Sequence, residues 1–151
     1  MINRNIYKQI LKTLSRGKSI LLLGPRQTGK TTIIKTIEHD RYINLMDITL
    51  RQRYEADISL LAKEIIMLNK LLKKKPRIII DEIQKIPSIT DSIQILIDDN
   101  IADFIITGSS ARKIKNLLPG RVIKFQMFPL SMNEIKHLDH KLKSLLIHGS
   151  L

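Results

Sequence analysis

The sequence predicts an α/β domain with three layers, in which helices cover both faces of a mainly parallel five-stranded sheet. Three observations predict this fold. Short aliphatic runs alternate along the chain with stretches of helical period. Most runs are rich in Ile and Leu without alternating polar residues, as in strands buried on both faces. A glycine-containing turn over residues 24–31 joins the first run directly to a helical stretch.

The composition is that of one globular domain of 151 residues, with 43% hydrophobic and 26% charged residues. Cysteine is absent, which excludes disulfides and thiolate metal sites. The apolar runs are far shorter than a membrane span, and the N-terminus lacks the apolar region of a signal peptide. We therefore expect a cytoplasmic protein with no membrane contact.

The formal net charge is +12, with 26 Lys and Arg against 14 Asp and Glu. Such an excess is typical of proteins that contact nucleic acid, but it also arises when lysines are spread over solvated faces. The basic residues are dispersed and aromatic residues are 4% of the chain, so stacking platforms for bases are scarce. We expect weak, salt-dependent nucleic-acid binding at most.

The first predicted element is a helix over residues 3–16, where apolar residues recur at helical spacing before Gly17. The aliphatic run 19–23 is the first predicted strand. Beyond the turn, residues 31–40 are expected to form a helix. Its predicted inward residues are Ile33, Ile34 and Ile37.

The turn between them fits the pattern G-x-x-x-x-G-K-[ST] without a gap, and strand, loop and helix follow in the required order. Its glycines allow the backbone to approach phosphate, and its N–H groups point positive charge at that phosphate. Lys30 adds a full charge near the β- and γ-phosphates, and the Thr31 hydroxyl is placed to bind magnesium. A surface turn of chance composition is the alternative, which the flanking strand and helix disfavour. The predicted nucleotide-binding residues of this loop are Gly24, Pro25, Arg26, Gln27, Thr28, Gly29, Lys30, Thr31 and Thr32.

A second strand is expected over residues 42–47, ending on Asp47. Residues 49–57 are charged and predicted to be irregular. Asp57 then caps a long predicted helix that ends near the lysines 73–75, which are favourable at a helix C-terminus.

Residues 77–82 form an aliphatic run that ends in Asp81 and Glu82. A buried strand of this kind delivers its carboxylates to the sheet edge where ligands bind in open α/β folds. Asp81 is suited to hold hydrated magnesium, and Glu82 to act as general base toward an attacking water. Two solvated acids at a strand end are the alternative, which the presence of the preceding loop in the correct chain order disfavours.

After a predicted helix over residues 89–98, residues 103–110 read as a strand that ends in hydroxyl side chains. Thr107 or Ser109 would hydrogen-bond the γ-phosphate or the attacking water. Ordinary helix capping by Ser109 or Ser110 is the alternative, and the sequence leaves both open.

The remaining elements complete the predicted sheet. A short helix through Ile114 and Leu117 is expected to end at Pro119-Gly120, and residues 122–127 alternate like a fifth strand. A capping box then opens a predicted amphipathic helix over residues 131–147.

The segments GPRQTGKTT (24–32), IIIDEIQKIP (78–87), FIITGSS (104–110), LLPGR (117–121) and FPLSMNEI (128–135) resemble one family of prokaryotic predicted ATPases of the AAA+ superfamily. The resemblance implies ATP and Mg²⁺ as ligands, with ATP bound by residues 24–32 and magnesium by Thr31 and Asp81. It implies catalysis through Glu82 with Lys30, a sensor near Thr107 and Ser109, and a strand inserted between the first and third strands. Arg121 occupies the family's Gly-Arg position, which makes it a candidate γ-phosphate or arginine-finger contact.

The implied organisation is an ATPase core over residues 1–151, with a nucleotide-binding part at 19–128 between the two terminal helices. Members of this family are usually longer, so we expect a truncated member that lacks the C-terminal lid and accessory domain. We expect Mg-dependent ATP binding with hydrolysis, and a homo-oligomer formed through the apolar stripe of the last helix. A non-hydrolysing, nucleotide-gated partner-binding module and a P-loop kinase are the alternatives. The adjacent acids Asp81 and Glu82 favour water activation over a kinase.

Overall fold

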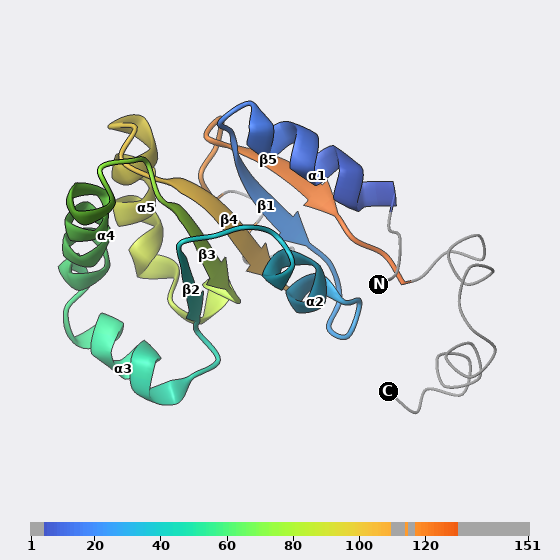
Figure 1. The fold of residues 1–151 in the computed structure, drawn as a ribbon. Coiled ribbons are helices and arrows are strands. Elements are labelled where there is room, and N and C mark those ends of the chain that lie inside the picture. Colours follow the sequence, from blue (N-terminus) through green and yellow to red (C-terminus); the bar gives the residue numbers. More distant parts are fainter. Residues whose placement is uncertain (1–4, 110–113, 115–116, 130–151) are drawn as a thin grey trace.

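A computed structural model describes residues 5–109, 114 and 117–129. In this part of the chain, five strands form one sheet in the order β2-β3-β4-β1-β5, and every pairing is parallel (Figure 1). The strands are β1 (Ser19–Leu23), β2 (Arg41–Asn44), β3 (Arg77–Asp81), β4 (Asp103–Gly108) and β5 (Val122–Gln126). The predicted fold class is confirmed, and β4 lies between β1 and β3 as the resemblance implied.

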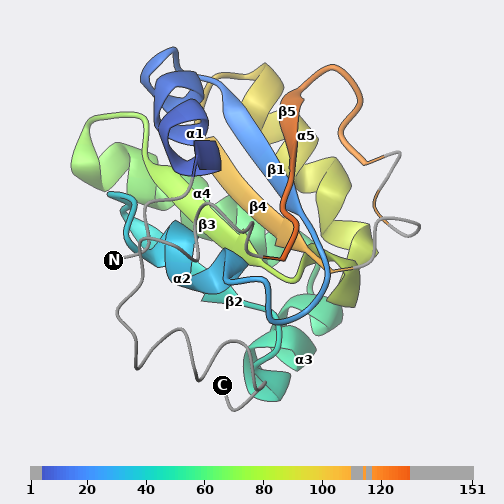
Figure 2. The ribbon, with the colours of Figure 1, turned by 90° about the vertical axis from the view of Figure 1, so that its right-hand side faces the viewer.

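Helices cover both faces of the sheet and complete the three layers. Figures 1 and 2 show α1 and α2 on one face, and α4 and α5 on the other. The helices are α1 (Asn5–Ser15), α2 (Lys30–Lys35), α3 (Ile48–Ala56), α4 (Ser59–Leu72) and α5 (Thr90–Asp98), with 3-10 turns η1 (Ile83–Lys85) and η2 (Pro87–Ile89). None of the helices within the described ranges is long and apolar enough to cross a membrane.

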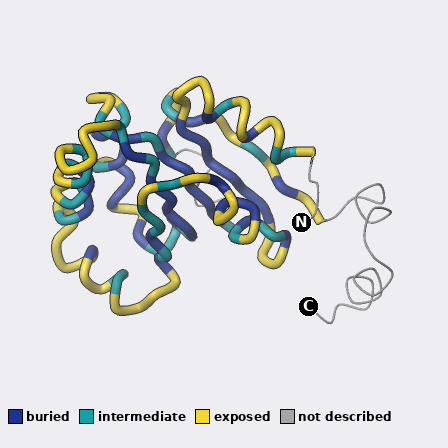
Figure 3. The backbone as a smooth tube through the Cα atoms, in the orientation of Figure 1, coloured by how far each residue is buried: buried dark blue, intermediate teal, exposed yellow. Residues whose placement is uncertain are grey.

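Alternate residues of the central strand β1 supply two separate apolar cores. Ile20 and Leu22 pack with Ile10 of α1 on one face, whereas Leu21 and Leu23 pack with Ile93 of α5 on the other. All of β1 is buried, and buried backbone follows the sheet while exposed residues lie mainly on the outer helices and loops (Figure 3). Burial on both faces explains why these strands appear in the sequence as continuous aliphatic runs.

The helix after the glycine loop is shorter than predicted. It ends at Lys35, where the Thr36 N–H donates to the Ile33 carbonyl and the Ile37 N–H donates to the Ile34 carbonyl, and the chain turns toward β2. Ile37 lies beyond the helix but is still buried, with 2% of its surface exposed. The predicted inward face of the helix is therefore right, but its predicted length is wrong. The buried Ile37 lies at helical spacing from Ile33 and Ile34, so the sequence pattern continues past the end of the helix.

The prediction that residues 49–57 are irregular is wrong, because most of them belong to helix α3. The strand β2 ends at Asn44, and Asp47 caps the helix instead of ending the strand. Asp47 Oδ1 accepts hydrogen bonds from the backbone N–H groups of Thr49 at 2.9 Å and Leu50 at 3.2 Å. Such a cap satisfies N–H groups that otherwise have no partner in the first helical turn.

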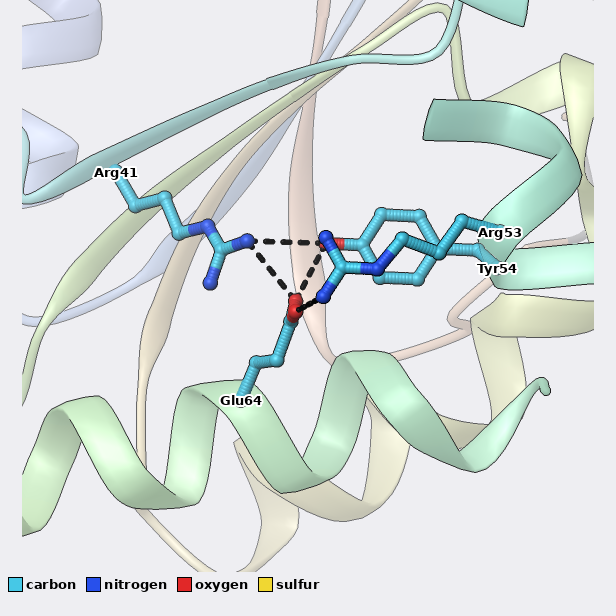
Figure 4. A network of polar contacts seen from close by, with 4 residues as sticks. All are labelled: Arg41, Arg53, Tyr54 and Glu64. Atoms are coloured by element: carbon cyan, nitrogen blue, oxygen red, sulfur yellow. Dashed lines mark hydrogen bonds and ion pairs between the residues drawn. The ribbon is translucent and has the colours of Figure 1, made fainter. Parts of the chain in front are cut away.

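Tertiary contacts hold α3 against α4 (Figure 4). Tyr54 is the buried residue of α3, and its hydroxyl donates to Glu64 Oε2 of α4 at 2.7 Å. Arg41 and Arg53 also bond the Glu64 carboxylate, at 2.9 and 2.6 Å. The helix therefore depends on partners outside its own sequence, which has no strong apolar period.

Some predictions fall on residues that the structure does not describe. These are the last helix at 131–147 with its capping box, the cap at Ser110 and most of the short helix near Ile114.

Candidate functional site

A pocket of about 400 Å³ lies at the carboxyl ends of β2 and β3, beside the glycine loop. Its walls combine residues of the loop and α2, residues in and after β2, and the two acids at the end of β3. The lining residues are Arg26, Gln27, Gly29, Lys30, Thr31, Thr32, Lys35, Tyr42, Asn44, Met46, Asp81 and Glu82. This is the sheet edge at which open α/β folds bind their ligands.

Two glycines of the loop are required for different reasons. Gly29 has φ 86°, a left-handed conformation that favours glycine. A Cβ on Gly24 would lie 2.4 Å from the carbonyl oxygen of Met127, which follows β5. Phosphate approach is the predicted role of both glycines, but Gly24 is also required by the packing of a distant segment.

The Lys30 ammonium ties the end of the loop to its beginning. Its Nζ donates to the carbonyl oxygens of Gly24 and Pro25, both at 2.7 Å, and the residue is 5% exposed. Burial lowers the pKa of Lys30, while the nearby charges of Glu82 and Asp81 oppose that shift. The predicted cation and the predicted acids therefore share one electrostatic environment.

The Asp81 carboxylate is nearly buried and accepts hydrogen bonds from three hydroxyl groups. Thr31 Oγ1 donates to Oδ2 at 2.9 Å, Tyr42 OH donates to the same oxygen at 2.7 Å, and Thr107 Oγ1 donates to Oδ1. The two predicted magnesium residues, Thr31 and Asp81, are thus in direct contact. Tyr42 is an additional partner that sequence analysis missed.

The donor set around Asp81 fits magnesium held jointly by protein and phosphate. Hydroxyl and carboxylate oxygens are the ligands of hard cations, and magnesium is usually bound by one or two carboxylates together with substrate phosphates and water. Within the described ranges, no group of three or more His, Cys, Asp or Glu residues could hold a metal by itself. The Thr31 hydroxyl and the Asp81 carboxylate are oxygen ligands of this kind, and they fit a metal that arrives with a nucleotide.

Glu82 follows β3 in a left-handed conformation, with φ 64°. Such a backbone conformation is strained in a residue with a Cβ, and strain of this kind concentrates at functional sites. Its backbone N–H donates to Thr107 Oγ1 at 3.0 Å, so Thr107 contacts both acids. Its Oε2 accepts from Ser109 Oγ at 3.0 Å and from Gln84 Nε2. The predicted sensor residues Thr107 and Ser109 hence lie against the two acids.

Tyr42 and Gln84 contact the two acids and are among the site residues that the sequence did not predict. Gln84 belongs to the segment IIIDEIQKIP, so the motif itself contained that signal. Tyr42 lies outside every motif and reaches Asp81 because β2 pairs with β3, with Asn44 opposite Asp81. Burial and the hydrogen bond to Asp81 raise the pKa of Tyr42, which favours the protonated hydroxyl that donates to Asp81.

The structure does not bring Arg121 to this pocket. Arg121 immediately precedes β5, whose first residue pairs with Ser19 at the start of β1, so it lies at the amino ends of the strands. The strand β5 has 5 residues, which separates Arg121 from the loop end of the sheet by about 16 Å. Its guanidinium bonds the Asp98 carboxylate at 3.0 to 3.2 Å. A γ-phosphate contact within the same chain is therefore not supported, whereas a contact with another copy's nucleotide stays a prediction.

Replacing Arg121 with alanine is expected to leave ATP affinity unchanged and to lower the free energy of unfolding by about 0.2–1 kcal/mol, since its pair with Asp98 is partly exposed. Arg26→Ala is the comparison, because Arg26 lines the pocket and its loss should weaken ATP binding. Nucleotide titration and urea unfolding measure the two effects. If Arg121→Ala bound ATP more weakly than the unsubstituted chain while being equally stable, Arg121 would be assigned to the nucleotide site.

A parallel sheet with a P-loop sequence after its first strand and an acid pair at the end of its third defines a P-loop ATPase-like core. The model of the AAA domain family matches residues 16–136. The chain therefore belongs to the AAA domain family, within the AAA+ superfamily of P-loop proteins.

Two similar sequences are the uncharacterized proteins Mb2031c of Mycobacterium bovis and Rv2008c of Mycobacterium tuberculosis. Each is 28% identical over 138 residues, which cover 87% of this chain and 30% of the relative. The chain thus spans less than a third of the length of these relatives. Among solved structures, PCH-2 of C. elegans superposes with a TM-score of 0.60 at 15% identity, covering 97% of this chain and 49% of that one. This likeness supports the fold alone.

Proposed function

We propose that this chain binds ATP with magnesium and hydrolyses the bond to its γ-phosphate. The observation that carries the proposal is the shared pocket, which joins Lys30 and Thr31 at the start of α2 to Asp81 and Glu82 at the end of β3. The contact of 2.9 Å between Thr31 and Asp81 supports a metal position between loop and strand. The family to which the chain belongs is consistent with this use of the pocket.

In the proposed complex, residues 24–32 surround the triphosphate. Lys30 transfers its N–H donors from the carbonyls of Gly24 and Pro25 to phosphate oxygens. Thr31 and Asp81 hold magnesium, which neutralises charge on the phosphate oxygens when it is bound.

Glu82 is the proposed general base. Two side chains, Gln84 and Ser109, contact its Oε2 and leave Oε1 as the oxygen that takes a proton from water. The same two contacts favour one alternative, in which Glu82 stays engaged and the chain is a non-hydrolysing, nucleotide-gated module. The proposal and this alternative differ in turnover but not in ATP binding.

The test is to measure ATP binding and phosphate release separately on the full chain, with and without magnesium. Magnesium-dependent binding together with release of free phosphate supports the ATPase. Binding without release supports the gated module. Phosphate that appears on an added acceptor, and not in solution, would indicate the kinase alternative.

Replacing Asp81 with asparagine is expected to raise the magnesium concentration needed for half-maximal ATP binding by about tenfold, because a charged ligand becomes neutral. Affinity for ATP in the presence of EDTA should change much less. Asp91→Asn is the matched control, since Asp91 is an exposed acid in the first turn of α5. An unchanged magnesium requirement in Asp81→Asn would remove this residue from the metal site.

We also propose that the functional assembly contains more than one copy of the chain. Of the described residues, Arg26 is the arginine that lines the pocket, while Arg121 lies at the other end of the sheet. An arginine delivered in trans stabilises charge on the transferring phosphoryl group and is worth about 10³–10⁵ in rate. A rate of hydrolysis per chain that rises with protein concentration would support this assembly, and a concentration-independent rate would contradict it.

A further inference from the structure

Tyr42 reaches the centre of the site from β2, an edge strand that carries no recognised motif. Its hydroxyl donates to Asp81 Oδ2 at 2.7 Å, and the Thr31 hydroxyl donates to the same oxygen at 2.9 Å. The residue also lines the pocket. Tyr42 therefore contacts the proposed metal-binding carboxylate as closely as the loop threonine does.

The ring of Tyr42 is held in place from two sides. It packs against the apolar core beneath α1 and α2, and the Lys35 ammonium lies 4.9 Å from the ring centroid. In the sheet, Tyr42 pairs with Ile79 and Asn44 pairs with Asp81, so Tyr42 lies on the same face as Asp81 and two residues away along the strands. The position of the hydroxyl is thus determined by packing and strand register before any ligand binds.

The hydrogen bonds to Asp81 occupy most of the acceptor positions of its carboxylate. An ionised carboxylate offers about four acceptor positions, and the hydroxyls of Thr31, Tyr42 and Thr107 occupy three of them. These donors belong to α2, β2 and β4, so both oxygens are fixed by separate elements of the fold. About one acceptor position remains for a metal ion or for a water bound to it.

We propose that Tyr42 is a positioning residue that holds the Asp81 carboxylate beside Thr31 and thereby sets the metal affinity of the nucleotide site. This inference rests on the proposed function, since it assigns a role toward the magnesium–nucleotide complex. Tyr42 does not contact the reacting atoms in this proposal. It acts through Asp81 and is expected to change metal binding more than nucleotide binding.

The experiment compares the full chain with its Tyr42→Phe variant, which retains the ring and removes the hydroxyl. Mn²⁺ replaces magnesium as the probe, and electron paramagnetic resonance measures free Mn²⁺ in the presence of saturating ADP. We expect Mn²⁺ to bind about 3- to 10-fold more weakly in Tyr42→Phe, since one hydrogen bond to a charged group is lost. The affinity for ADP in EDTA, measured by calorimetry, should stay within about twofold of the unsubstituted chain.

Tyr54→Phe is the matched control. The Tyr54 hydroxyl also donates to a carboxylate at 2.7 Å, that of Glu64, but neither residue lines the pocket. This variant loses the same chemical group at the same distance, so it reports any general effect on stability. Its Mn²⁺ affinity in the ADP complex should equal that of the unsubstituted chain.

Weaker Mn²⁺ binding in Tyr42→Phe alone supports the inference. Unchanged binding would overturn it, and tighter binding would also overturn it by showing that the hydroxyl competes with the metal. Equal weakening in both variants would assign the effect to stability and not to positioning. If the unsubstituted chain bound neither ADP nor Mn²⁺, both the proposed function and this inference would fail. If the unsubstituted chain bound both and Tyr42→Phe bound Mn²⁺ equally well, the inference alone would be rejected.

Discussion

Replacing Glu82 with glutamine is expected to reduce ATP hydrolysis by about 10²-fold or more while ATP still binds. The amide has the shape of the carboxylate but is not a base at neutral pH. The contacts of Gln84 and Ser109 with Oε2 are compatible with an amide oxygen at the same place, so the side chain should keep its position. The substitution is therefore expected to slow the chemical step without changing the structure of the pocket.

The measurement is phosphate release in a single turnover, beside equilibrium binding of a fluorescent ATP analogue. Glu55→Gln is the matched control, because Glu55 is an exposed carboxylate on α3 that does not line the pocket. Hydrolysis at the normal rate in Glu82→Gln would exclude Glu82 as the base. If the unsubstituted chain released no phosphate, the non-hydrolysing module would become the better description.

Replacing Lys30 with alanine is expected to weaken ATP binding by about ten- to a hundredfold, which corresponds to the loss of roughly 1.5–3 kcal/mol from a charge-assisted contact. The structure adds a second reason for a large effect. The two carbonyl oxygens of Gly24 and Pro25 lose the donor that joins the ends of the loop, so the loop itself becomes less ordered.

Nucleotide titration by calorimetry measures this effect, and thermal unfolding of the same samples shows whether the fold is retained. Lys70→Ala is the control, since Lys70 is an exposed lysine in the last turn of α4. Unchanged ATP affinity in Lys30→Ala would contradict the assignment of residues 24–32 to phosphate binding. A folded variant with weakened binding would support it.

The sequence by itself determined the elements whose chemistry is local. The strands β1, β3 and β4 were predicted closely, because a strand buried on both faces is a continuous aliphatic run. The loop at residues 24–31 and the acids Asp81 and Glu82 were also predicted, since spacing within one segment fixes which groups a loop or a strand end presents. Their assembly into one pocket followed from parallel strands, whose carboxyl ends meet at one edge.

Local pattern failed where a helix depends on partners elsewhere in the chain. The helix α3 has little apolar periodicity, and it is stabilised by the cap at Asp47 and by the contacts of Tyr54 and Arg53 with Glu64. The helix α2 ends at Lys35, although the buried Ile37 extends the helical spacing. The cap at Asp47 is a local signal, whereas the contacts of α3 with Glu64 and the burial of Ile37 come from tertiary packing, which propensity does not report.

The tertiary structure alone decided which distant residues meet. It placed Arg121 at the amino ends of the strands and paired it with Asp98, so this arginine does not reach the loop of its own chain. It also brought Tyr42 to Asp81, a residue 39 positions away in the sequence. Hydrogen bonds across such separations depend on strand order and register, and no local pattern of residues encodes them.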